Sequence, residues 1–137
     1  MSTVTLSLEE AHRLAMGALV KAGVGPASAA ATASALVAAE VDGQAGHGMS
    51  RVPSYTLHAR VGKVDGTAVP VAIAAGEAGV RIDAGHGFAY PAVDLAIDRL
   101  LPLVTRTGVA AAAIHRSHHF GQDRKSTRLN SSHITIS

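Results

Sequence analysis

The chain of 137 residues contains no cysteine and no tryptophan, and aromatic residues make up only 3% of it. The absence of cysteine excludes disulfide bonds and thiolate metal sites, and it is typical of a reducing compartment. Hydrophobic residues make up 47% of the chain, but alanine dominates among them and buries little area. Because each buried CH₂ group contributes only about 0.8 kcal/mol, we expect a thin core for this length.

Long apolar runs are also missing. No stretch reaches the roughly 18 consecutive apolar residues that a membrane-spanning helix needs. The first five residues lack the basic start that is typical of a signal peptide. These features predict a cytoplasmic protein without a membrane partner, and the length suits one modest domain.

The last 15 residues, 123–137, differ sharply in composition from the Ala-, Val- and Gly-rich chain before them. They resemble, residue for residue, the translation of a short-read sequencing adapter, which predicts a non-native, disordered tail. The alternative is a basic, Ser-rich tail that touches nucleic acid. The tail holds three of the 12 Lys and Arg residues and one of the 10 Asp and Glu residues. The rest of the chain, with nine of each, is neutral and predicts no nucleic-acid partner.

Three segments in the first half of the chain carry helical signals. Ser7 and Glu10 form a capping-box pattern in front of an apolar repeat that includes further leucines and alanines at helical spacing. A second helix is expected from Pro26, which suits the first helical turn, to about Val41. A third is expected over residues 52–61, because a proline is tolerated in a first turn. These segments predict a helical N-terminal part.

Strand signals begin in the second half. Residues 69–75 and 79–83 predict two short strands joined as a hairpin. Residues 90–107 predict a long helix that a glycine closes, with a core stripe that includes Leu100 and Leu101. Residues 109–114 predict a buried strand. Together with the N-terminal helices, these elements predict an α+β fold in which a mixed sheet with a long helix comes last.

A glycine-rich stretch after the second helix, residues 43–51, is the strongest candidate for chemistry. His47 lies between two glycines, and Arg51 follows four residues later. Histidine exchanges a proton near neutral pH, and arginine offers a planar fork that binds a carboxylate through two hydrogen bonds. A 2-hydroxy or 2-oxo acid requires such a pair. The residues alone favour a plainer interpretation, a loop with a solvated histidine and a surface arginine.

Other histidines lie further along the chain. We expect His58 at the surface of the third helix, and we expect His86, between two glycines, to have a structural role in a turn. His115, His118 and His119 follow the last strand and suggest a metal site, but zinc needs three or four ligands and no cysteine supports them. We therefore predict no metal site. A non-catalytic, His-rich metal or interaction module stays as an alternative.

Two motifs carry a resemblance to a known family. They read Asp42-Gly43, Gly46-His47-Gly48, Arg51, Pro53, Tyr55 and Gly62-Lys63, and then Ser117-His118-His119-Phe120-Gly121. From about Leu6 to Gln122 the chain resembles the type-2 malate/L-lactate dehydrogenase family, which also holds sulfolactate, ureidoglycolate and piperideine-2-carboxylate reductases. The resemblance implies the family's own non-Rossmann dinucleotide fold. Residues 1–122 would be its truncated N-terminal part, since members of the family are more than twice as long.

The resemblance implies reversible hydride transfer between NAD or NADP and a small 2-hydroxy or 2-oxo acid of the malate, lactate or sulfolactate type. His47 would exchange the proton, and Arg51 would hold the substrate carboxylate. The cofactor-binding residues that it implies are His119, Phe120, Gly121 and Gln122. Many members carry a serine before the histidine, where this chain has Gly46, so the group that orients the imidazole differs here.

The family also contains an alternative chemistry, the reduction of a cyclic imine such as piperideine-2-carboxylate. That reaction would use the same His47 and Arg51. The resemblance further implies a homodimer when the protein is full length. Because most of the dinucleotide fold would be encoded beyond Gln122, we expect the chain to be inactive by itself.

Overall fold

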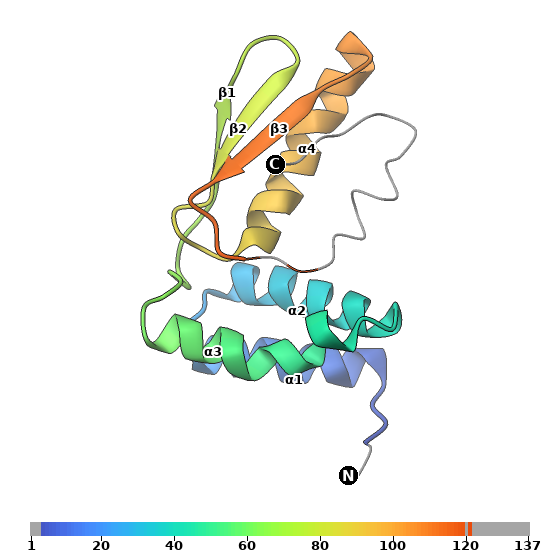
Figure 1. The fold of residues 1–137 in the computed structure, drawn as a ribbon, viewed down its shortest axis with the longest axis vertical. Helices are drawn as coiled ribbons and strands as arrows, with labels where there is room; N and C mark the ends of the chain where they lie inside the picture. Colours follow the sequence, from blue (N-terminus) through green and yellow to red (C-terminus); the bar gives the residue numbers. More distant parts are fainter. Residues whose placement is uncertain (1–3, 120, 122–137) are drawn as a thin grey trace.

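The computed structural model describes residues 4–119 and 121 and arranges them in two layers (Figure 1). The helices are α1 (Leu8–Lys21), α2 (Pro26–Val41), α3 (Val52–Arg60) and α4 (Ala89–Thr107), and the strands are β1 (Val71–Ala74), β2 (Gly79–Asp83) and β3 (Ala111–His115). The first three helices form one layer, and the sheet with α4 forms the other. The predicted α+β class is confirmed, and the predicted tail at 123–137 lies outside the described residues.

The first helix begins where the capping box predicts. Ser7 Oγ accepts a hydrogen bond from the Glu10 N–H at 3.2 Å, and the Glu10 carboxylate accepts one from the Ser7 N–H at 2.9 Å. These bonds satisfy two N–H groups that have no partner within a helix. The backbone bond to Ser7, and then its side-chain bond, lower the pKa of Glu10 because both favour the carboxylate.

Small side chains let α1 and α2 pack closely. The buried positions of the two helices include Ala11, Ala15, Leu19, Ala29, Ala33 and Leu36. The apolar repeat after the capping box predicts that its leucines face the core. This is wrong for Leu8 and Leu14, whose side chains are 62% and 50% exposed. The helical layer therefore has the thin, alanine-rich core that the composition predicts.

The sheet has the order β1-β2-β3. The first two strands form the predicted antiparallel hairpin, whereas β2 and β3 are parallel and are connected through α4. Because parallel strands end at the same edge, Asp83 and His115 are paired at the carboxyl ends of β2 and β3. Figure 1 shows that this edge faces the helical layer, so the loops that follow both strands meet the helices.

Two predictions for the second layer are wrong. The strand β3 is not buried, because it lies at an edge of the described sheet and only Ala112 is fully covered. Leu101, expected on the core side of α4, is 48% exposed. None of the α-helices in the described part of the chain has the length and apolar character that crossing a bilayer requires.

The beginning of α4 joins the two layers. Phe88 and Tyr90 pack into the core of the helical layer with Leu36 and Tyr55. Further along, α4 packs against the sheet through small and aliphatic side chains such as Leu100. One helix therefore fixes the position of the sheet relative to the three N-terminal helices.

Two helix glycines predict opposite responses to alanine. Gly108 ends α4 with a left-handed φ of 78°, whereas Gly17 lies inside α1 with nothing within 4 Å of an added Cβ. Gly108→Ala should lower the unfolding free energy by about 1 kcal/mol, because a Cβ disfavours that conformation. Gly17→Ala should raise it by about 0.5–1 kcal/mol. Urea denaturation measures both, and a stabilised Gly108→Ala variant would contradict the left-handed helix end.

Candidate active site

The turn that carries His47 and Arg51 closes on the end of α2. It consists of two short 3₁₀ helices, η1 (Ala45–His47) and η2 (Met49–Arg51). The Glu40 carboxylate accepts a hydrogen bond from the Met49 N–H at 2.9 Å. An added Cβ on Gly48 would collide with this carboxylate and lie 3.2 Å from the Glu40 Cα. A side chain at position 48 would have to displace the Glu40 carboxylate that binds this turn, which gives the second glycine of the motif a packing reason.

Arg51 is held by the same turn. Its Nε donates a hydrogen bond to the carbonyl of Gly46 at 2.6 Å. Because Gly46 directly precedes His47, the guanidinium lies back along the turn toward the histidine. The bond fixes the plane of the guanidinium through Nε and leaves the two terminal nitrogens as donors for a ligand.

His47 meets the second motif. An added Cβ on Gly121 would lie 2.9 Å from His47 Nδ1, so the imidazole packs against the Gly121 backbone. The Gly121 N–H donates to the Tyr90 hydroxyl at 3.2 Å. Within the described residues, His47 Nδ1 is buried and has no hydrogen-bond partner. Two of the predicted cofactor residues, Phe120 and Gln122, lie outside the described part of the chain.

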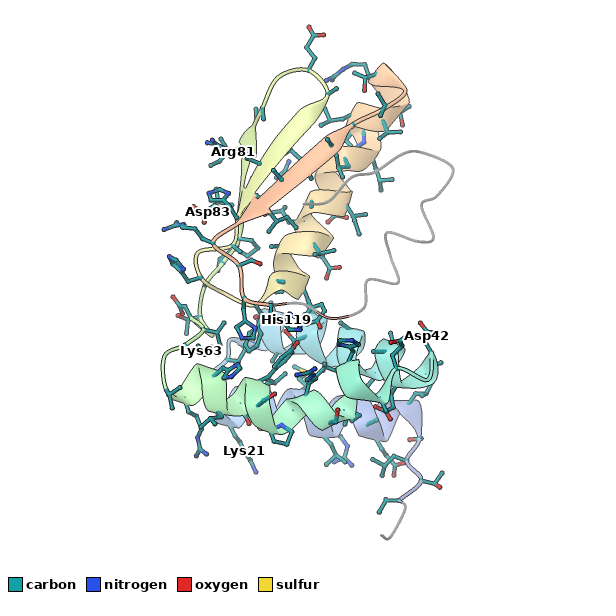
Figure 2. The ribbon with its side chains drawn as sticks, in the orientation of Figure 1. Lys21, Asp42, Lys63, Arg81, Asp83 and His119 are labelled. Atoms are coloured by element: carbon teal, nitrogen blue, oxygen red, sulfur yellow. The ribbon has the colours of Figure 1, made fainter. Side chains whose placement is uncertain are left out.

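A cavity of about 560 Å³ lies where the carboxyl edge of the sheet meets the helical layer. Its described wall consists of Arg51, Ser54, Tyr55, His58, Lys63, His86, Ser117, His118 and His119. Figure 2 shows His119 and Lys63 at this junction. No residue of this wall is acidic and two carry a fixed positive charge, so the cavity suits an anion. Arg51 and His119 belong to the wall, whereas His47 lies outside it and packs against Gly121.

One face of α3 forms the floor of this cavity. His58 was expected at the surface, but its Nδ1 lies 3.0 Å from Nε2 of His118. The prediction of a surface position is wrong. Whether a side chain meets the sheet loops depends on the helix face on which it lies, and the residue type does not decide this. A signal was present in the sequence: Arg51, Ser54, Tyr55 and His58 follow one another at steps of three, one and three residues, which places them on one face.

The surroundings of the two histidines disfavour their charged forms. The His118 ring lies 5.4 Å from the ring of Tyr55 and 5.5 Å from that of Phe88, between ring centroids. Burial lowers the pKa of His118, and His58 nearby lowers it further. Burial and then the charge of Lys63 lower the pKa of His58. Both shifts favour the uncharged imidazoles.

Two loops from the sheet form the opposite wall. His86 and Arg116 have left-handed φ angles of 62° and 51°, and the His86 N–H donates to the Arg116 carbonyl at 2.6 Å. The Arg116 guanidinium binds Asp83 through two hydrogen bonds of 2.9 and 2.6 Å. These bonds, followed by one from the Gly85 N–H, hold the pKa of Asp83 at about 2. The structural role predicted for His86 applies to its backbone, while its ring lines the cavity.

The same combination of sequence and fold occurs in known proteins. The sequence model of the family described as "Malate/L-lactate dehydrogenase" matches residues 6–127. The chain belongs to the malate/L-lactate dehydrogenase family. This confirms the family predicted from the two motifs.

Individual family members match over most of the chain. (2R)-3-sulfolactate dehydrogenase (NADP(+)) from Chromohalobacter salexigens is 47% identical over 116 residues, which are 85% of this chain and 34% of the relative. Delta(1)-pyrroline-2-carboxylate reductase from Ancylobacter novellus is 40% identical over 117 residues, with the same two coverages of 85% and 34%. The crystal structure of delta1-piperideine-2-carboxylate reductase from Pseudomonas syringae pvar. tomato has a TM-score of 0.83 and 39% identity, over 87% of this chain and 36% of that one. The chain thus spans about a third of the length of these relatives.

The family's serine has room in this chain. The resemblance implies a serine at position 46, and an added Cβ on Gly46 would meet nothing within 4 Å. The φ angle of Gly46 is not positive, so its backbone conformation does not require a glycine. Steric exclusion therefore does not explain the glycine, and nothing else in the structure does.

The three clustered histidines point to different neighbours. His115 Nε2 lies 3.8 Å from the Asp83 carboxylate, His118 is bonded to His58, and His119 lines the cavity. Over residues 4–119 and 121, no group of three His, Asp or Glu side chains is arranged to hold a metal ion. The structure therefore gives the metal-module alternative no site in this part of the chain.

The histidine pair predicts a loss of stability in mild acid. The folded-state pKa values of His58 and His118 lie below 6.5, the ordinary value that the unfolded chain keeps. As the pH falls, the unfolded state therefore binds protons at a higher pH than the folded state does. The contribution of the pair to the unfolding free energy is complete above about pH 6.5, and it is lost as the pH falls below that value toward the lower folded-state pKa values. Urea denaturation at about pH 7.5 and 5.5 measures the decrease. The variant His118→Phe should show a smaller decrease in the unfolding free energy, whereas His115→Gln, at an exposed position, should show the same decrease as the unsubstituted chain. An unchanged decrease in His118→Phe would contradict the role of the histidine pair.

Proposed function

We propose that the chain is the N-terminal part of an NAD(P)-dependent oxidoreductase that transfers a hydride between nicotinamide and a small 2-hydroxy or 2-oxo acid. The cavity carries the proposal, because its described wall has no acidic residue and includes Arg51 beside the turn of His47. The relative from Chromohalobacter salexigens, named for sulfolactate and NADP(+), supports the substrate class and the cofactor. The activity would belong to a protein about three times as long, as the 34% coverage of that relative suggests.

In this proposal Arg51 holds the substrate carboxylate. Its bond to the Gly46 carbonyl keeps the guanidinium plane fixed, so little side-chain freedom is lost when an acid binds. His47 exchanges a proton with the oxygen on C2. Its Nδ1 is covered by Gly121, which leaves Nε2 as the nitrogen that takes the proton from the hydroxyl or returns it to the forming alkoxide.

When bound, the nicotinamide cofactor supplies or accepts the hydride. We assign His119, Phe120, Gly121 and Gln122 to its binding surface. Support comes from Gly121, whose lack of a side chain lets the backbone lie directly on the His47 ring while its N–H is fixed by Tyr90. Gly121 therefore suits the approach of a flat ring close to the proton-exchanging group.

A cyclic-imine reductase is the second candidate, favoured by the names of the relatives from Ancylobacter novellus and Pseudomonas syringae. It would use Arg51 for the carboxylate in the same way. We further propose a cytoplasmic homodimer. The absence of cysteine supports the compartment, and exposed apolar side chains on the sheet layer, such as Val71 and Leu101, support a covered face.

A turnover assay tests the incompleteness of the chain. The purified 137-residue protein, supplied with NADH or NADPH and pyruvate, oxaloacetate or sulfopyruvate, should show no oxidation of the nucleotide at 340 nm, about the wavelength at which its reduced ring absorbs. The reason is that most of the cofactor surface would come from segments that this chain lacks. Robust activity of the purified chain would contradict the proposal that the chain is inactive by itself.

A chimaera tests the two residue roles. Residues 6–121 replace the matching third of the Chromohalobacter salexigens relative, and turnover of NADPH with sulfopyruvate is measured. His47→Gln should lower kcat by roughly 10²–10⁴-fold with little change in KM. Arg51→Met should raise KM by roughly 10–100-fold, since a charged hydrogen bond is lost. Arg60→Met is the matched control, because Arg60 is exposed at the end of α3, the helix that follows Arg51, and lies outside the cavity wall. Equal effects of the two arginine variants would refute the carboxylate role.

Substrate profiling of the same chimaera separates the two candidate functions. Faster turnover of sulfopyruvate or oxaloacetate than of piperideine-2-carboxylate favours the hydroxy-acid enzyme. The reverse order favours the imine reductase.

A further inference from the structure

The His47 imidazole is not fixed by its own turn. Both neighbours, Gly46 and Gly48, lack a side chain, and among the described residues His47 Nδ1 has no hydrogen-bond partner. The His47 N–H donates to the Gln44 carbonyl at 2.8 Å, but this backbone bond does not restrict the rotation of the ring. A group that exchanges a proton must keep its nitrogen within hydrogen-bond reach of the substrate. The plane of the imidazole therefore depends on a contact from elsewhere in the chain.

That contact comes from Gly121. An added Cβ on Gly121 would lie 2.9 Å from His47 Nδ1 and 3.1 Å from both Cβ and Cγ of His47. The Gly121 backbone therefore lies along the edge of the ring that is joined to the chain. Close packing at this edge leaves the ring little room to rotate. It does so only as long as Gly121 itself stays in place.

The segment that carries Gly121 is bonded at two points near the beginning of α4. The His118 N–H donates to the Gly87 carbonyl at 2.9 Å, and the Gly121 N–H donates to the Tyr90 hydroxyl at 3.2 Å. The Tyr90 ring is 7% exposed and belongs to the core of the helical layer, so its hydroxyl has a fixed position. Of the two bonds, the one to Tyr90 acts directly at the glycine that touches His47.

The Tyr90 hydroxyl also contacts the helix that follows the carboxylate-binding residue. It lies 3.4 Å from the hydroxyl of Tyr55, which belongs to α3, and α3 begins directly after Arg51. Three segments that are distant in the sequence therefore meet at one phenol oxygen. This arrangement relates the position of the His47 ring to that of Arg51.

We propose that Tyr90 is a positioning residue for the exchange of the proton. Its hydroxyl holds Gly121 against His47 and thereby fixes the plane of the imidazole relative to the acid bound at Arg51. Tyr90 is not part of the described cavity wall, so it acts through Gly121 and not on the substrate. This inference rests on the proposed function and adds to it a residue that lies outside both sequence motifs.

The contact is tested by NMR on the isotope-labelled 137-residue chain. The α-protons of Gly121 should give nuclear Overhauser cross-peaks with the His47 ring, and relaxation of the ring C–H groups should give an order parameter of about 0.85. Tyr90→Phe keeps the buried ring and removes the hydroxyl. It should remove the cross-peaks and lower the order parameter below about 0.6. Thr105→Val removes an exposed hydroxyl from the same helix and should change neither.

The consequence for turnover is measured in the chimaera with the Chromohalobacter salexigens relative, with NADPH and sulfopyruvate. Tyr90→Phe should lower kcat about tenfold and leave KM within about twofold, because a displaced proton donor slows the chemical step and not the binding of the acid. Gly121→Ala, whose Cβ would push against the ring, should also lower kcat. Thr105→Val should leave both constants unchanged. Urea denaturation shows that each variant is folded.

The outcomes separate the positioning role from the proposed function. Absence of the cross-peaks from the unsubstituted chain, or their persistence in Tyr90→Phe, overturns the positioning role. It is also overturned if Tyr90→Phe raises KM as strongly as it lowers kcat. If Tyr90→Phe leaves kcat unchanged while His47→Gln lowers it, the proposed function stands and the positioning role is overturned. If His47→Gln leaves kcat unchanged, the proposed function fails, and the positioning role fails with it.

Discussion

The ion pair between Asp83 and Arg116 fixes the loops on which the cavity depends. It joins the carboxyl ends of two parallel strands through hydrogen bonds of 2.9 and 2.6 Å. The two loops include His86 and Arg116 in left-handed conformations, which cost about 1–3 kcal/mol each for a residue with a side chain. The bidentate pair and the bond from His86 N–H to the Arg116 carbonyl hold both conformations. The sheet-side wall of the cavity follows directly from these loops.

Tyr90 connects the packing of the core to the geometry of the site. Its ring is buried with α1–α3, and its hydroxyl lies 3.4 Å from that of Tyr55 and accepts the N–H of Gly121. The hydrophobic contacts that join the two layers therefore also place Gly121 on the His47 ring. Burial in this region raises the pKa of Tyr55 well above its usual range, with the Tyr90 hydroxyl adding to the effect, so the Tyr55 phenol acts as a neutral hydrogen-bonding group.

Local signals in the sequence predicted most of the elements, because helix caps and turns are decided by neighbouring residues. The capping box at Ser7 and the glycine at the end of α4 are examples. The exposure of Leu101 was not predictable in this way. Helical spacing puts His58 on one face with Arg51, but which way that face points depends on how the sheet lies against the helices. For the site, the motif placed His47 and Arg51 on one turn, but their surroundings come from residues after β3. Their chemical roles stay predictions.

The charge state of the histidine pair explains how one cavity can gather so many basic residues. If His58 and His118 were both protonated beside Lys63, three positive charges would repel one another in this part of the cavity. Burial among the rings of Tyr55 and Phe88 lowers the pKa of His118, so the pair supplies hydrogen-bond donors without adding charge. An anion bound there would favour protonation of the pair, since an opposite charge raises the pKa of a histidine.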